Sequence, residues 1–149
     1  TDGFAIGVID QVALLRTRKP MEAASVDALF RVTTSMMQEY GPRLLYVVIP
    51  GARRPSVDPD AQKRIAALWP KIQAQSLAGV MWIRNAGFTG ALNRKQLSEQ
   101  LPYLRDRSLL GVTVSAWETV EYFLNHTTQL EIDSRAWTHA FEQFAACYD

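Results

Sequence analysis

Two arginines and a serine directly after an apolar run are the residues that most suggest chemistry in this chain. The run at residues 44–49, LLYVVI, leads into PGARRPSVDPD, which contains Arg53, Arg54 and Ser56. Guanidinium groups bind anions such as phosphate through paired, charge-assisted hydrogen bonds. The order Arg-Arg-Pro-Ser also resembles a kinase substrate, and the two arginines could hold an added phosphate. The pattern predicts an anion site or a phosphorylation site at Ser56, with a solvated loop as the alternative.

Three further polar residues follow other apolar runs. Arg84 and Asn85 come after AGVMWI, and Ser115 comes after LGVTV. If these runs are parallel strands, their carboxyl ends meet at one edge of a sheet, where helix N-termini also favour anions. We therefore expect these three residues to lie with the two arginines around one binding edge, for a phosphate, a nucleotide or an acidic peptide.

Residues suited to catalysis or metal binding are few. His126 and His139 fall on different expected helices, and the sequence has no phosphate-binding loop, dinucleotide-binding glycine motif or nucleophile elbow. Asp58 and Asp60 flank a proline at an expected helix start, where the helix dipole favours acids. We therefore expect no enzymatic activity, no metal ion and no cofactor.

Composition narrows the class of protein. A length of 149 residues suits a single domain, and a net charge of +1 favours neither nucleic acid nor a membrane surface as partner. No apolar run is long enough to predict a membrane span. A single cysteine, Cys147, and the absence of a signal-peptide pattern in the opening residues predict a cytoplasmic location.

Apolar patterning predicts the elements that position these side chains. Five strands are expected, at residues 4–8, 12–16, 44–49, 78–83 and 110–114. The first two suit a hairpin, and the other three have the continuous apolar character of buried parallel strands. Helices are expected at residues 21–40, after Asp58, ahead of residue 107, at 115–125 and from residue 133. The sequence therefore predicts an α/β fold with a mostly parallel central sheet, an antiparallel edge hairpin and four to five helices.

Local signals place the helix starts. Asp58 is expected to begin one helix with Pro59 in its first position. Ser115 and Glu118 have the spacing of a capping box at the start of another. Pro70 lies within the first of these helices, so we expect that helix to be kinked or shortened there.

The last twenty residues, 130–149, are expected to be a helical extension within a single domain that spans 1–149. Four aromatic residues at helical spacing form a stripe along it, namely Trp137, Phe141, Phe144 and Tyr148. Such a stripe predicts a docking surface, either against the rest of the domain or against a partner.

An opening hairpin followed by alternating helices and buried strands resembles the STAS domain (sulphate transporter and anti-sigma factor antagonist). The resemblance covers about residues 4–125 and rests on LLYVVIPG, GVMWIRNAGFTGAL and LLGVTVSAWETVEYFLN, which are most similar to bacterial STAS-like proteins of poorly known function. Members that act as phosphorylation switches carry Asp-Ser-Ser-Gly after the third strand. In this chain Ser56 is the only hydroxyl residue of that junction, and no glycine follows it.

This resemblance implies a non-catalytic regulatory or signalling module of a bacterial cytoplasm. It would act by contact with a protein partner, and a second copy of this chain is one candidate. The hydrophobic content of 48% leaves an alternative, a carrier whose core encloses a small molecule or a lipid.

Overall fold

The computed structural model describes residues 3–51, 57–84, 95, 99, 110–127 and 130–148. The elements in chain order are β1 (Phe4–Ile9), β2 (Val12–Thr17), α1 (Ala23–Tyr40), β3 (Leu44–Ile49), α2 (Pro59–Gln75), β4 (Ser76–Trp82), β5 (Leu110–Thr113), α4 (Ala116–His126), α5 (Ser134–Ala145) and a 3₁₀ turn (Ala146–Tyr148). Of the helix expected ahead of residue 107, the structure describes only residues 95 and 99, both as helical, and the loop at 52–56 lies outside the described residues.

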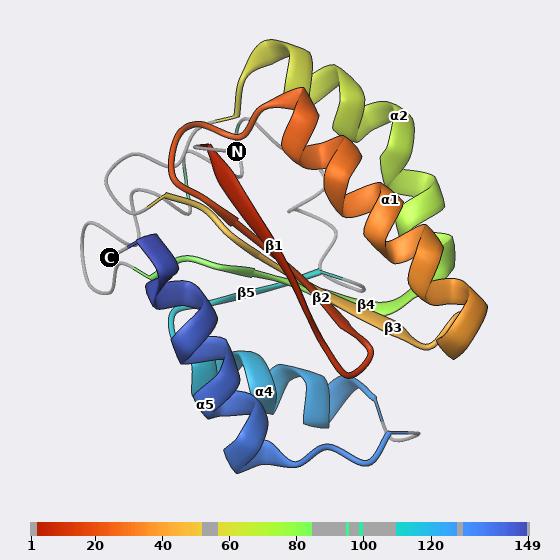
Figure 1. Ribbon diagram of the computed structural model, residues 1–149, viewed down its shortest axis with the longest axis vertical. Coiled ribbons are helices and arrows are strands. Elements are labelled where there is room, and N and C mark those ends of the chain that lie inside the picture. The colour runs from red at the N-terminus through yellow and green to blue at the C-terminus, as the bar shows by residue number, and fades with distance from the viewer. Residues whose placement is uncertain are drawn as a thin grey trace.

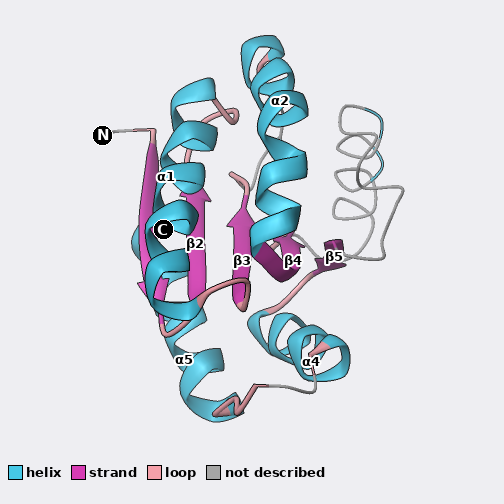
Figure 2. Cartoon of the chain, turned by 90° about the vertical axis from the view of Figure 1, so that its right-hand side faces the viewer, coloured by secondary structure: helices cyan, strands magenta, loops and turns pink. Residues whose placement is uncertain are grey.

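The strands form one five-stranded sheet in the order β1-β2-β3-β4-β5, which Figure 2 shows side by side. β1 pairs antiparallel with β2, and the remaining neighbours are parallel. A two-residue turn joins Ile9 to Val12, and Asp10 has the positive φ of 49° that tight hairpin turns require. The predicted α/β fold, with an antiparallel hairpin at the edge of a parallel sheet, is confirmed.

Helices cover both faces of the sheet (Figure 1). The side chains of β2 alternate, so Ala13 and Leu15 join the core under α1 and α2, whereas Val12 and Leu14 join the core under α4 and α5. This alternation explains why β2 is buried along its whole length. The sheet is therefore the middle layer of three.

The aromatic stripe of the C-terminal helix packs against the domain itself. Trp137 and Phe141 are 3% and 0% exposed in the core between the sheet and α4–α5. Phe144 lies against β1, where a Cβ added at Gly7 would come within 2.7 Å of its ring. Of the two docking surfaces that the sequence allowed, the structure shows contact with the rest of the domain.

Both expected helix caps are present. The carboxylate of Asp58 accepts a hydrogen bond from the backbone N–H of Asp60 at 2.8 Å, and Pro59 is the first residue of α2. Ser115 accepts from the N–H of Glu118 at 3.1 Å, and the Glu118 carboxylate accepts in turn from the N–H of Val114 at 3.1 Å. The capping box at the start of α4 is therefore complete.

The expected shortening of α2 at Pro70 is wrong, because the helix continues to Gln75. Ile65 lies before the proline and Ile72 after it, and both are buried in the same core. Apolar packing thus holds both halves of the helix against the sheet and outweighs the backbone hydrogen bond that a proline cannot donate.

Two tyrosines fill the space left by glycines in neighbouring strands. Tyr46 of β3 lies across β4, where a Cβ added at Gly79 would come within 2.0 Å of its ring. On the other face, Tyr122 of α4 lies over Gly111 in the same way, at 2.4 Å. The Tyr46 hydroxyl is buried and has no hydrogen-bond partner within the described structure. Burial therefore raises the pKa of Tyr46 well above its usual range.

We predict that the Tyr46→Phe variant folds normally. Its free energy of unfolding should equal that of the wild type or exceed it by up to about 1 kcal/mol, because the substitution removes an unpaired buried hydroxyl. The wild-type chain should also lose stability above about pH 10, where tyrosine ionises in the unfolded chain while folded Tyr46 keeps its proton. Urea titrations at pH 7 and pH 10.5 (roughly half a unit above that pKa) should show a smaller alkaline loss in the variant. A variant destabilised by more than about 2 kcal/mol at pH 7 would show that the hydroxyl is bonded.

Candidate functional site

Arg84 and Ser115 lie at the same edge of the sheet, as the sequence predicted. Arg84 follows β4 and Ser115 follows β5, and these two strands are parallel neighbours. Their exits are joined by a hydrogen bond of 2.8 Å from the N–H of Ile83 to the carbonyl of Thr113. The other residues expected at this edge lie outside the described residues, namely Arg53, Arg54, Ser56 and Asn85.

A buried arginine organises this edge. Arg16 lies near the end of β2 with only 3% of its surface exposed. Its Nε donates to the carbonyl of Ala145 at 3.0 Å, and its Nη1 donates to the carbonyls of Thr17 and Pro50 at 3.1 and 2.9 Å. One guanidinium group therefore joins the exits of β2 and β3 to the end of α5.

Arg84 contacts the same acceptor as Arg16. Its Nη1 donates to the carbonyl of Ala145 at 3.3 Å. Ala145 is the last residue of α5, and the final carbonyls of a helix lack partners within the helix and carry the negative end of its dipole. The two guanidinium groups therefore cap α5 and offset that partial charge.

At the edge where we expected an external anion, Arg84 instead binds an acceptor of its own chain, the carbonyl of Ala145. Arg84 contacts a helix end of its own chain, and the Ser115 hydroxyl caps α4. Sequence reasoning missed Arg16, which it took only as the last residue of a strand. Its position in the strand does indicate this role. Arg16 follows Leu14 by two residues and Val12 by four, so its side chain points to the same face of the sheet, towards α4 and α5.

Both ends of the segment that contains Ser56 are held against the connection between β2 and α1. Before it, the N–H of Gly51 donates to the Thr17 hydroxyl at 3.2 Å. A Cβ at Gly51 would come within 2.9 Å of the Arg18 carbonyl, so a glycine is needed for this close approach. After it, Val57 forms a parallel bridge with Met21.

A groove runs between α4 and α5 on the outside of the molecule. It has a volume of about 510 Å³ and is lined by Trp117, Ser134, Arg135, Thr138, His139 and Glu142. Trp117 is 49% exposed, which is unusual for the largest apolar side chain. Leu124 is 39% exposed and lies seven residues further along α4, two helical turns away on the same side. The outer side of α4 therefore presents two large apolar side chains to solvent.

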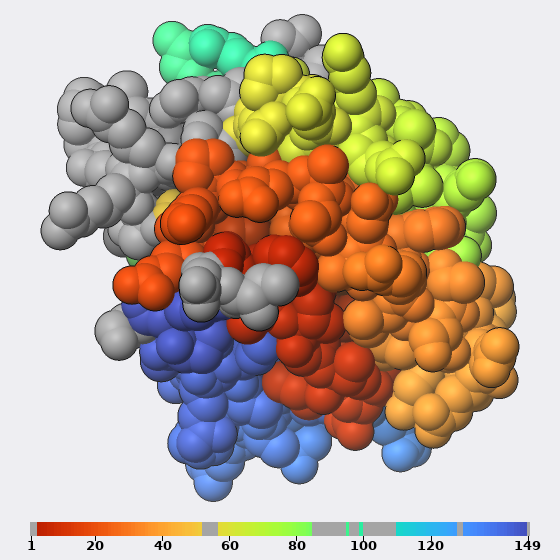
Figure 3. All heavy atoms as spheres, turned by 45° about the horizontal axis from the view of Figure 1, so that its top comes forward, coloured from red at the N-terminus to blue at the C-terminus, as the bar shows by residue number. Residues whose placement is uncertain are grey.

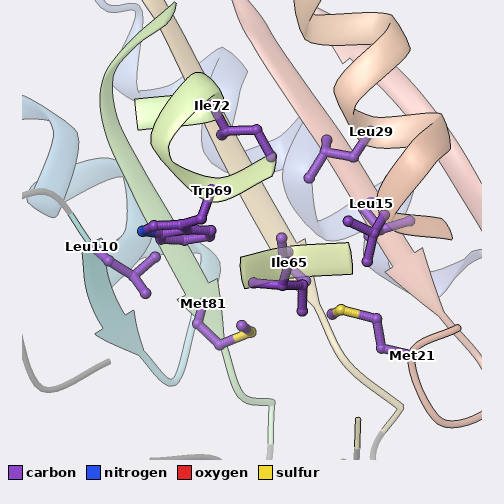
Figure 4. Close-up of a pocket in the computed structure, with 10 residues that line it drawn as sticks. Leu15, Met21, Leu29, Ile65, Trp69, Ile72, Met81 and Leu110 are labelled. Atoms are coloured by element: carbon purple, nitrogen blue, oxygen red, sulfur yellow. The ribbon is translucent and has the colours of Figure 1, made fainter. Parts of the chain in front are cut away.

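An internal cavity lies between the sheet and the helices α1 and α2 (Figure 4). Its labelled lining is apolar and includes Trp69 and Met81, which Figure 4 shows around the same space. The cavity measures about 40 Å³, while one water needs roughly 10–15 Å³ on this scale. It has room for a few water-sized molecules and would have to expand greatly to take a lipid chain.

No group of three or more metal-ligating side chains comes together in the parts of the chain that the structure describes. Over the same residues, no helix combines the length and the apolar character needed to cross a membrane. Cys147 is exposed and forms no disulfide.

Comparison with known proteins assigns no family: no family model, curated protein or solved structure matches this chain. The function must therefore be argued from the arrangement of the residues themselves. Two features carry the most information, namely the arginine-capped helix end and the groove beside Trp117.

We predict that Arg16→Met destabilises the fold by about 3 kcal/mol, because the carbonyls of Thr17 and Pro50 lose their donor and the carbonyl of Ala145 loses one of its two guanidinium donors. Arg18→Met is the matched control. Arg18 is exposed and lies with its guanidinium 5.8 Å from the centre of the Tyr148 ring, a contact worth about 0.5–1 kcal/mol.

Urea unfolding of the two variants measures this difference. Equal losses of stability would contradict the structural role assigned to Arg16.

Proposed function

We propose that this chain is a non-catalytic regulatory module of STAS-like type that acts by binding another protein in a bacterial cytoplasm. The observation that carries the proposal is the pair of exposed apolar side chains, Trp117 and Leu124, on the outer side of α4. An opening antiparallel hairpin followed by parallel strands supports the STAS-like type, because it is the arrangement that the resemblance implies.

The chemistry of the α4 surface favours a helical partner. Tryptophan is enriched among the residues that dominate binding energy at protein interfaces. Trp117 and Leu124 are separated by about 10.5 Å along the helix axis, so both can contact the apolar face of a single amphipathic helix. Arg135 and Glu142 line the α5 side of the groove and offer both signs of charge to the polar flank of such a helix.

The polar groups at the strand exits support a non-catalytic role. Arg16 and Arg84 donate to the end of α5, and the Ser115 hydroxyl accepts a bond from the α4 backbone. Each of these groups has a structural interaction that accounts for its position.

Two substitutions on α4 test the proposal. We expect Trp117→Ala with Leu124→Ala to weaken capture of the partner by at least about 30-fold, because central interface anchors contribute about 2 kcal/mol or more. The unfolding free energy should change by less than about 0.5 kcal/mol for each exposed site. Quantitative mass spectrometry of proteins captured from the source cells measures the first effect.

The control for this experiment is the pair Lys63→Ala and Lys71→Ala, which removes two exposed side chains from α2 on the other face of the sheet. Proteins captured by the wild type and the α2 control, but lost with the α4 variant, are the expected result. Capture profiles that are the same for all three chains would overturn the proposed surface.

We further propose that an anion or a phosphate at Ser56 modulates this binding. The segment before α2 is tied at both ends to the β2–α1 connection, so added charge there would act next to a fixed part of the fold. Ser56→Asp should change partner affinity severalfold and leave the unfolding midpoint within error, with Ser56→Ala as control. Isothermal titration of the captured partner measures this, and equal affinities of all three chains would remove the regulatory step.

A further inference from the structure

The strand β1 is an open edge of the sheet. In Figure 1 it lies at the front of the view, and in Figure 3 its red surface remains visible between the orange helix α1 and the blue helix α5. Pairing with β2 uses only one side of this strand. The other side faces away from the sheet, between the two helices.

The hydrogen-bond pattern of the hairpin shows which backbone groups point outward. The N–H of Arg18 donates to the carbonyl of Gly3 at 3.0 Å, so Gly3 belongs to a hydrogen-bonded pair of the hairpin. Inward and outward groups alternate along an antiparallel strand. Ile6 and Val8 therefore direct their N–H and C=O groups away from β2, and no partner for them is found in the described part of the chain.

Within the described residues, this edge lacks the features that normally prevent strand pairing. Natural edge strands are protected by charged side chains, prolines or bulges. β1 has the sequence FAIGVI, without a charged residue or a proline, and its pairing with β2 is regular. Val8 is 52% exposed, the highest value among the large apolar side chains that the structure describes.

We propose that β1 pairs antiparallel with β1 of a second copy of this chain, about a twofold axis near the middle of the strand. Outward groups of Ile6 and Val8 then bond across the axis, and the two sheets join into one of ten strands. Val8 becomes covered by the β1 side chains of the second copy. Assembly stops at the dimer, because each copy has used its open β1 edge in the pairing.

Charge complementarity favours a second copy as the occupant. Asp10 lies at one end of β1, and Arg18 lies beside Gly3 at the other end. Both side chains are on the α5 side of the sheet, since Asp10 accepts a bond of 2.7 Å from Trp137 Nε1 and Arg18 lies over the Tyr148 ring. Antiparallel pairing brings Asp10 of one copy towards Arg18 of the other, twice by symmetry, at an end of the strand where the carboxylate of Glu22 also lies beside Gly3. The uncharged middle of the strand brings no like charges together.

This inference is independent of the proposed function, because β1 and the outer side of α4 are different surfaces. If the β1 dimer is disproved, the proposed binding surface on α4 is unaffected, and the reverse also holds. A dimer formed through β1 would present two copies of the α4–α5 groove to partners.

The test is the mass of the full chain in solution, measured by sedimentation equilibrium over a range of micromolar concentrations. We expect a dimer for the wild type. Val8→Pro removes an outward N–H without removing a β1–β2 bond, and Val8→Lys adds a charge to the edge. Each should raise the dimer dissociation constant by at least about tenfold, equivalent to 1.4 kcal/mol. Circular dichroism melting identifies which of the two variants is folded.

Leu124→Lys on α4 is the matched control, since it also places a charge at an exposed apolar position, and it should leave the dimer unchanged. Arg18→Glu should weaken the dimer, because it places two acids together at each end.

A monomeric wild type at all concentrations would overturn the proposal. A dimer that both Val8 variants leave unchanged would also overturn it, as would a dimer that Leu124→Lys dissociates. A monomer whose β1 edge pairs with a strand of another protein would overturn it as well.

Discussion

The buried guanidinium group of Arg16 is the interaction on which the rest of this structure depends. A charged side chain with 3% exposure is tolerated only when its donors are satisfied, and here the acceptors are carbonyls from β2, from the β3 exit and from the end of α5. These three segments are far apart in the sequence. The group therefore fixes the final helix to the edge where the parallel strands end.

The position of α5 determines which surfaces are available for binding. Its inner side brings Trp137 and Phe141 into the core, so these aromatic residues are not available to a partner. Its outer side forms one wall of the groove beside Trp117. Along its length α5 also lies against β1 through Phe144, yet it leaves the outer edge of that strand uncovered. The docked helix thus forms one wall of the groove and leaves the edge of β1 uncovered.

Much of the fold could be predicted from the sequence because its signals are local. Alternation and continuous apolar runs identified the strands, and the Ser115–Glu118 capping box identified the start of α4. Pro70 does not shorten α2 as the sequence suggested, because packing of distant residues overrides a local preference. β4 also begins two residues earlier than expected, at Ser76, where it pairs with Leu44.

The candidate site was harder to predict, because its contacts join residues that are distant in the sequence. Parallel strand order placed Arg84 and Ser115 at one edge as expected. The acceptor for Arg84 is Ala145, 61 residues away, and nothing near either residue indicates that contact. The exposed side of α4 was missed for a similar reason, since which side of an amphipathic helix is covered depends on where α5 docks.

The central claim is that Arg16 makes α5 an integral part of the domain. Native-state hydrogen exchange of the α5 amides tests it most directly, because exchange reports the free energy of opening each segment. We predict that the slowest α5 amides in the wild type exchange only through global unfolding, with the same free energy as the strands of the sheet. An α5 that opens several kcal/mol more easily than the sheet, and equally easily with methionine at position 16, would contradict the claim.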